Sequence, residues 1–255
     1  MDLVVDELTS LETQREAASL LAVVWQVPAD RPPLLPEVLR ALSHTGNYVA
    51  GAWADGRLVG ASVAFAAGHS ATLHSHITGV LPQAQGGGVG AALKHHQRRW
   101  AADHGFERIT WTFDPLIRRN ARFNLHALGA TAVAFHPDFY GPLDEPIDAG
   151  DETDRLLASW AVDTDSPTQP WSDGVLVLAD DGGRPLAHPP PGPGVPWLVQ
   201  VPKDVATMRS SDPAAAREWR VALRETLRRA FDEEHLTAVD VTEDGCYVLV
   251  GAVAP

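Results

Sequence analysis

The sequence has a single cysteine, Cys246, among its 255 residues. Because a disulfide needs two cysteines, no bridge can form within the chain, and so low a cysteine content is typical of a reducing cytoplasm. A small buried apolar residue in a strand is the simplest interpretation of Cys246. No apolar run approaches the length of a membrane span, and the acidic N-terminus lacks the basic start of a secretory signal. We therefore expect a cytoplasmic protein without a membrane partner.

Positive charge is also scarce, since 20 basic residues face 33 acidic ones and the formal net charge is −13. So acidic a chain is a poor general binder of nucleic acid, and no nucleic-acid partner is expected. An anionic ligand would need a local group of basic residues, and the sequence contains one. Its members either surround a functional loop, as their clustering favours, or line solvated helix faces: Lys94, His95, His96, Arg98, Arg99, Arg118, Arg119 and Arg122.

Motifs for metal binding and for hydrolysis are missing as well. No His, Cys and Asp cluster has metal-ligand spacing, and the pair His74 and His76 lacks a third ligand, so no metal is expected. The absence of a Gly-x-Ser-x-Gly elbow disfavours a Ser-His-Asp hydrolase. Neither the Gly-x-Gly-x-x-Gly nor the Walker pattern of nucleotide-binding loops is present.

What the sequence does contain is a strand, a glycine-rich turn and a helix in succession. β-Branched residues on alternating sides predict a strand at Thr72–Val80, the turn covers residues 85–90, and a helix runs from about Val89 toward Asp103. Such a turn directs backbone N–H groups out of a helix N-terminus, where they bind anions, above all phosphate. Glycine permits the close approach and the φ values that this needs. The alternative is a flexible loop that caps an ordinary helix.

The remaining pattern predicts a mixed α/β protein, because an antiparallel meander is followed by helical crossovers. Strands are expected at residues 1–7, 48–54, 57–67, 108–113 and 130–135, the last continuing through 138–140. Helices are expected at 11–26, at 37–44 with Pro36 in the first turn, and at 120–128. The proline- and glycine-rich tail adds a long helix from 212 to about 234 and strands at 175–179, 197–201, 237–241 and 246–252.

The glycine loop reads QGGGVGA from Gln85 to Ala91, and Val80-Leu81-Pro82 stands before it. With the order of the elements and the later stretch RRNARFNLHALGA, it resembles the acyltransferases of the GNAT superfamily. Phrases within residues 74–161, SHITGV and WTFDPL among them, are similar to a subgroup of predicted GNAT acetyltransferases, which supplies no substrate. The resemblance implies a mixed α/β GNAT fold at 1–162, with a mostly antiparallel sheet splayed to hold coenzyme A (CoA), and a smaller α/β extension at 163–255.

The resemblance also implies a reaction, the transfer of an acetyl or short acyl group from acetyl-CoA to the amine of a small molecule. The loop backbone would hold the pyrophosphate, and the backbone at 79–81 would pair with the pantetheine arm and donate an N–H toward the acyl carbonyl oxygen. The residues expected to bind CoA are Gly79, Val80, Leu81, Gln85, Gly86, Gly87, Gly88, Val89, Gly90, Ala91, Arg118, Asn120, Phe123 and Asn124. Assembly into a homodimer stays open.

Two histidines on the strand before the loop are the candidate general base. His74 and His76 are two residues apart, so their side chains are expected on one face of the sheet and that of Ser75 on the other. Imidazole titrates near neutrality, which suits a base for an amine. The distance to the loop is similar to that of the two histidines of arylalkylamine N-acetyltransferases. A hydrogen-bonded core histidine is the alternative interpretation.

The general acid is less well defined. Leu125 stands where the family often has a tyrosine that protonates the thiolate, and Tyr140 is the nearest substitute, with packing at a strand end as its alternative role. Asp114 and Asp138 either bind a cationic substrate or form turns and caps. The missing tyrosine leaves a second hypothesis open, a CoA-binding regulatory module without catalysis. A third is an acyl-CoA enzyme whose acceptor is not an amine.

Overall fold

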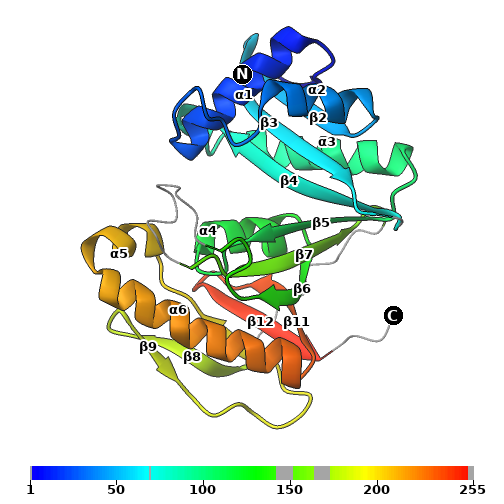
Figure 1. Ribbon diagram of the computed structural model, residues 1–255. Coiled ribbons are helices and arrows are strands. Elements are labelled where there is room, and N and C mark those ends of the chain that lie inside the picture. The colour runs from blue at the N-terminus through cyan, green and yellow to red at the C-terminus, as the bar shows by residue number, and fades with distance from the viewer. Residues whose placement is uncertain (1, 69, 142–151, 164–172, 252–255) are drawn as a thin grey trace. The chain divides into compact units, whose positions relative to one another are not determined.

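The computed structural model describes residues 2–68, 70–141, 152–163 and 173–251, and their contacts divide them into two compact units. Among these residues the first unit contains 2–111 and 161–163, and the second contains 112–141, 152–160 and 173–251. Both units combine helices with strands, so the predicted mixed α/β class is confirmed (Figure 1). The functional domains at 1–162 and 163–255 stay a prediction.

An antiparallel meander and one parallel strand form the sheet of the first unit. In their order across the sheet the strands are β1 (Leu3–Glu7), β2 (Tyr48–Ala54), β3 (Arg57–Ala66), β4 (Thr72–Val80) and β5 (Arg108–Phe113). The first four are antiparallel neighbours, whereas β4 and β5 run parallel. Asp55 and Gly56 take the positive φ values that the tight turn between β2 and β3 needs.

Helices cover both faces of this sheet. They are α1 (Leu11–Trp25), α2 (Pro36–His44) and α3 (Val89–Asp103), with the 3-10 turn η1 (Pro82–Ala84) before α3. A Cβ placed on Gly79 would meet side chains of α1, whereas one placed on Gly60, the partner of Val80, would meet side chains of α3. Since neighbouring residues of a strand face opposite ways, α1 and α3 pack on opposite faces of β3 and β4.

The strands of the second unit also lie side by side in a sheet. In order across it the strands are β7 (Arg155–Ala161), β6 (Thr131–His136), β11 (Leu236–Val241), β12 (Cys246–Gly251), β10 (Trp197–Gln200), β8 (Val175–Asp181) and β9 (Arg184–Ala187). The helices are α4 (Arg118–Ala121), α5 (Val205–Ser211) and α6 (Pro213–Arg228), and π-helical turns follow α4 (η2, Arg122–Ala127) and α6 (η3, Arg229–Glu233). Figure 1 shows α6 running along β8 and β9, which it contacts. Through the pairing of β11 with β6, the tail extends the sheet beyond β6.

Most predicted elements are confirmed to within two residues, and the differences have physical causes. The strand expected at 138–140 is wrong: Asp138 has a φ of 43° and its carboxylate accepts from the Thr153 N–H, so the chain turns there. The helix expected at 120–128 is a turn of α-helix followed by the wider winding of η2. Strands β7 and β9 and helix α5 were not predicted from the sequence.

None of the described helices is both long and apolar enough to cross a membrane.

Candidate active site

The glycine-rich loop lies between η1 and α3 in the first unit. Gly86 and Gly88 both have a φ of 80°, in the left-handed region that glycine tolerates. Gly88 is the N-cap of α3, and no side chain caps this helix, so the N–H groups of its first turn are left to other partners. Residues 85–88 are exposed. The loop therefore leaves exposed backbone N–H groups at a helix N-terminus, the arrangement that anions bind in other proteins.

One edge of β4 is open beside this loop. The pairing of β4 with β5 covers Thr72–His74 and Arg108–Thr110, and in the described part of the chain no strand pairs with residues 75–80 on that edge. There the side chain of Gln85 donates a hydrogen bond to Val80 O at 3.2 Å. On the other edge, Leu81 donates its N–H to Val59 O at 2.9 Å. Because N–H groups of a strand point to its two edges in alternation, the N–H of Val80 is directed at the open edge. An extended ligand with amide groups can pair with such an edge.

The two histidines lie at a bulge in β4. Ser75 pairs with Ala64 and Ile77 with Val63, which leaves His76 as the extra residue. The ring of Phe65 lies 5.4 Å from that of His74 and 5.7 Å from that of His76, centroid to centroid, so both imidazoles flank one side chain. Ser75 is buried and accepts a hydrogen bond from α3 on the opposite face.

Both imidazoles are held in their neutral form. Burial lowers the pKa of His76, and burial together with the charges of His76 and Lys94 lowers that of His74. The Nδ1 of His74 lies 3.3 Å from Thr110 Oγ1, which orients the ring. A neutral imidazole on a partly exposed strand can accept a proton at neutral pH.

The basic group expected around the loop does not form one exposed patch. The expectation is wrong for Lys94, which is 5% exposed and extends from α3 to Ser75 of β4. His96 shares a hydrogen bond of 3.0 Å with the Tyr48 hydroxyl, and Arg98 donates to Val162 O at 3.0 Å. These side chains stabilise the fold of the first unit, so the anion site rests mainly on the loop backbone.

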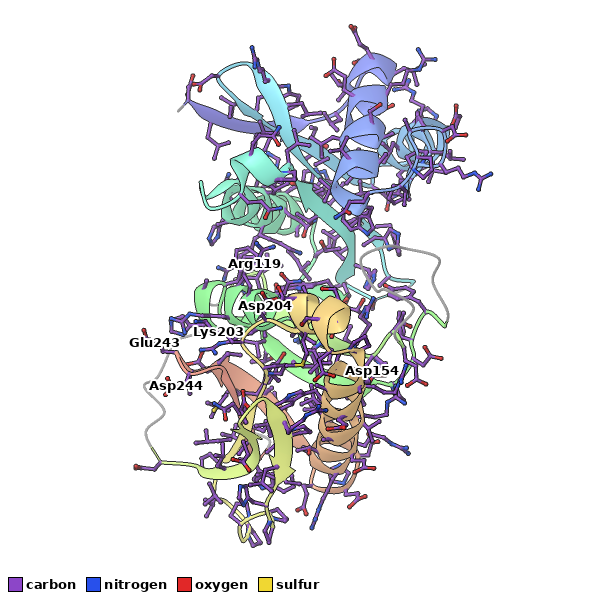
Figure 2. The ribbon with its side chains drawn as sticks, turned by 90° about the vertical axis from the view of Figure 1, so that its left-hand side faces the viewer. Arg119, Asp154, Lys203, Asp204, Glu243 and Asp244 are labelled. Carbon is purple, nitrogen blue, oxygen red and sulfur yellow. The ribbon has the colours of Figure 1, made fainter. Side chains whose placement is uncertain are left out.

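The remaining candidates belong to the second unit and are described within it: Arg118, Asn120, Phe123, Asn124 and Tyr140. Arg118 donates a hydrogen bond to the backbone oxygen of Glu243. Figure 2 labels Glu243, which lies between β11 and β12. Asn120 is exposed, Phe123 is half-buried and Asn124 is buried. Tyr140 is 41% exposed, and its hydroxyl lies 3.0 Å from Thr112 Oγ1.

Asp114 has a structural role that the sequence left open. Its carboxylate lies 2.6 Å from Arg209 and 3.3 Å from Arg220, both from the tail, and it accepts from the Leu116 N–H at 2.8 Å. Burial alone would raise the pKa of Asp114, but the charges of Arg220 and Arg209 outweigh it and the pKa is lowered. Asp114 is thus an anchor for α5 and α6 rather than a site for a cationic substrate.

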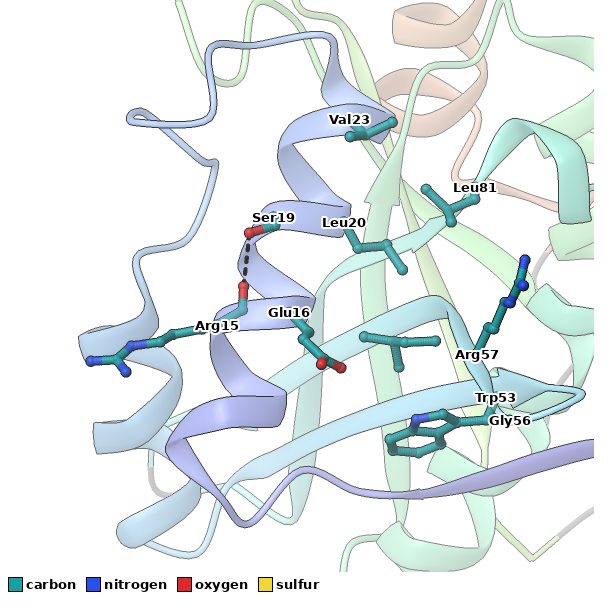
Figure 3. Close-up of a pocket in the computed structure, with 10 residues that line it drawn as sticks. Arg15, Glu16, Ser19, Leu20, Val23, Trp53, Gly56, Arg57 and Leu81 are labelled. Carbon is teal, nitrogen blue, oxygen red and sulfur yellow. Dashed lines mark hydrogen bonds between the residues drawn. The ribbon is translucent and has the colours of Figure 1, made fainter.

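A hollow of about 670 Å³ lies elsewhere in the first unit, between α1 and the β2–β3 hairpin (Figure 3). Leu20 and Leu81 face it, with Glu16 and Arg57 among the charged residues that line it. Leu81 is the one predicted site residue in its lining, and neither histidine contributes to it. The hollow and the histidine pair are separate features of this unit.

These features define a class: an α/β domain with a glycine-rich loop at a helix N-terminus, a strand edge left unpaired beside it and two imidazoles on that strand. Residues 13–129 match the model of the acetyltransferase (GNAT) family. That segment contains the loop and both histidines, and it is a domain of the GNAT superfamily. The expectation from the sequence is confirmed at this level.

Solved structures agree in fold. An acetyltransferase of the GNAT family from Streptococcus pneumoniae is 15% identical, with a TM-score of 0.50 over 63% of this chain and 99% of that one. An N-acetyltransferase from Staphylococcus aureus Mu50 is 10% identical, with a TM-score of 0.51 over 64% and 99%. Ard1 from Thermoplasma volcanium is 14% identical, with a TM-score of 0.50 over 63% and 98%. None of the curated proteins compared with the chain matches it in sequence.

Proposed function

We propose that the protein is a cytoplasmic N-acyltransferase that moves an acetyl or short acyl group from acetyl-CoA to the amine of a small molecule. The observation that carries this proposal is the combination on β4 of an open edge, a glycine loop at its end and two neutral histidines. Each part serves one requirement of acyl transfer: holding an anionic cosubstrate, polarising a carbonyl and accepting a proton.

The backbone would hold the acyl donor. N–H groups of residues 85–91 would bind the pyrophosphate, and the pantetheine arm would pair with β4 at Gly79–Leu81. Since Leu81 already donates to Val59 O, the N–H of Val80 is the donor best placed for the acyl carbonyl oxygen. Losing one such donor typically costs about 2.7–4 kcal/mol of barrier.

The histidine pair would prepare the nucleophile. An aliphatic amine arrives mostly as ammonium, and a neutral His74 or His76 would take its proton, directly or through water. The free amine would then form the C–N bond as the C–S bond breaks and the thiolate leaves. Tyr140 is the candidate acid for that thiolate, and the thiolate of CoA is also stable enough to leave without one.

The first test is binding, measured by calorimetry with CoA and acetyl-CoA. Gly88→Ala should weaken CoA binding strongly, because alanine is strained at a φ of 80° in the loop. Gly105→Ala is the matched control, since Gly105 has a φ of 77° and open space around it but ends α3 away from the loop. If CoA does not bind the wild type at millimolar concentration, the proposal is wrong.

The second test is turnover, followed as thiol release with acetyl-CoA and a panel of amines. We expect His76→Ala and His74→Ala to lower kcat by about 10²–10⁴-fold and to remove the acid limb of the pH profile. His44→Ala, an exposed histidine at the end of α2, should leave both unchanged. An unaltered pH profile in both site variants would remove their role as the base.

The burial of Leu125, 1% exposed, favours a second candidate function, a CoA-binding regulatory module without catalysis. A buried leucine cannot protonate a thiolate, so the family's usual acid is replaced here by a core residue. This candidate predicts CoA binding in the first test and no thiol release with any amine in the second. Thiol release with alcohols alone would instead support a non-amine acceptor.

A further inference from the structure

Lys94 is a buried amino group that the proposed reaction does not use. It extends from α3 toward β4, where its Nζ donates to Ser75 Oγ at 2.9 Å and lies 3.5 Å from Gln97 Oε1. The Nζ also lies 3.9 Å from the ring centroid of Trp111. Among the described residues no carboxylate is an ion-pair partner of Lys94. A lysine is rarely buried unless it is paired, so this one needs an explanation.

A chain of hydrogen bonds continues from Lys94 along the same face of the sheet. Gln97, whose oxygen faces Lys94, donates its Nε2 to Ser62 Oγ at 3.3 Å, and that hydroxyl lies 2.8 Å from Thr78 Oγ1. Ser62, Ser75 and Gln97 are all buried. The chain therefore fastens α3 to β3 and β4 on both sides of the bulge at His76.

We propose that Lys94 is a positioning residue for the histidine pair. Its amino group holds Ser75 by a hydrogen bond on the α3 face of the sheet, and its positive charge acts on His74 from that face. Ser75 is the residue between the two histidines, so fixing it on the α3 face fixes the backbone from which both imidazoles project to the other face. The link to catalysis rests on the proposed function, whereas the link between Lys94 and His74 does not.

The charges that act on His74 support this role. They belong to His76 on the same strand and to Lys94 from α3, and both lower its pKa, while the nearest group of β5 is the uncharged Thr110 hydroxyl. Burial lowers the pKa of Lys94 to about 7. At the lower pH where His74 titrates, Lys94 is therefore mostly an ammonium, and its charge opposes protonation of His74. Burial alone lowers the pKa of His76, so Lys94 distinguishes between the two histidines.

The test is a titration of wild type and Lys94→Met by NMR, following the histidine rings and the lysine side chains. The chain has only two lysines, Lys94 and the exposed Lys203, so Lys203→Met assigns both signals and is the matched control. We expect the Lys94 signal to titrate near pH 7 and the midpoint of His74 to move to higher pH in Lys94→Met. The midpoint of His76 should move less than that of His74 in Lys94→Met, and neither midpoint should move in Lys203→Met. A Lys94 signal that does not titrate below pH 9, or a His74 midpoint that does not move, overturns the proposal.

Ser75→Ala separates the hydrogen bond from the charge. Without its hydroxyl acceptor the Lys94 ammonium is less stable, so the Lys94 midpoint should fall below that of the wild type. An unchanged midpoint would show that Ser75 does not hold Lys94.

The pH profile of kcat/KM then tests the consequence for catalysis. In Lys94→Met the acid limb should move to higher pH. The ratio of kcat/KM between wild type and variant should become smaller above pH 8, because Lys94 is then deprotonated in the wild type and neither protein has a charge at position 94. If the ratio is independent of pH, Lys94 supports structure alone. If the wild type has no activity, the proposed function fails, while the NMR titration still decides whether Lys94 acts on His74.

Discussion

Each of the two units buries a cluster of polar side chains. In one cluster the buried charges have counter-ions, and in the other the buried charge has none among the described residues. In the second unit, the carboxylates of Asp114 and Asp154 lie 2.6–3.3 Å from arginines of α5 and α6. Asp154 is labelled in Figure 2. In the first unit, Lys94 meets a hydroxyl, an amide oxygen and an aromatic ring, without a carboxylate among the described residues.

The difference decides which cluster can change with pH. A buried ion pair keeps both charges, and the pKa of Asp114 lies below its usual range. A buried charge without a counter-ion is instead relieved by losing its proton, and the pKa of Lys94 falls to about 7. The ion pairs of Asp114 and Asp154, here called the paired cluster, therefore keep their charges across the physiological pH range. The group around Lys94, here called the unpaired cluster, gains or loses a proton within that range.

Breaking the paired cluster should have the largest effect. Asp114→Ala removes the buried carboxylate that Arg209 and Arg220 share, and we expect the free energy of unfolding to fall by about 3–5 kcal/mol. Denaturant titration measures this loss. Asp232→Ala is the control, because this carboxylate is 61% exposed and 4.0 Å from Arg228, and it should change little. Equal effects of the two substitutions would contradict the structural role of Asp114.

The unpaired cluster should make stability depend on pH. Because the pKa of Lys94 is about 7 in the folded protein and near 10.5 when unfolded, the folded state binds fewer protons between these values. The cost of the buried ammonium is thus complete below pH 7 and disappears toward pH 10.5, and stability rises over that window by at most about 1.4 kcal/mol per pH unit. Lys94→Met should abolish this rise in denaturant titrations at several pH values, and Lys203→Met should keep it. Parallel curves for all three proteins would refute a buried, titrating Lys94.

Substituting Arg224, the partly exposed member of the paired cluster, should have an intermediate effect on the free energy of unfolding. Arg224 donates two hydrogen bonds to Asp154, at 2.7 and 3.0 Å, but it is itself 22% exposed. Arg224→Met should therefore cost about 1.5–3 kcal/mol, the range for hydrogen bonds to charged groups. Arg228→Met, at a position 63% exposed, is the comparison and should cost much less in the same measurement.

The smallest effect is expected at the far end of the unpaired cluster. Ser62→Ala removes the hydroxyl between Gln97 and Thr78 and should cost about 0.5–1.5 kcal/mol, with the pH dependence due to Lys94 retained. Ser19→Ala, which loses one exposed hydrogen bond to Arg15 O, is the control. If Ser62→Ala removed the pH dependence as well, the titrating group would depend on the whole chain of hydrogen bonds.

Much of the fold could be predicted from local pattern. The strand Thr72–Val80, the helix Val89–Asp103 and the hairpin at Asp55-Gly56 follow from side-chain alternation, turn chemistry and glycine. The pairing of Asp114 with Arg209 could not, because 95 residues separate them and nothing local marks either residue as a partner. Lys94 was misjudged for a related reason, since its basic neighbours Arg98 and Arg99 favoured an accessible basic group around the loop.

By itself the sequence determined the order of the elements, the glycine-rich loop before α3 and the alternation that separates Ser75 from His74 and His76. These follow from backbone geometry over a few residues. Only the tertiary structure decided which charges are buried and what faces them, because burial depends on segments that fold together from distant parts of the chain. For that reason the role of Lys94 became visible only when α3, β4 and β5 were seen packed around its amino group.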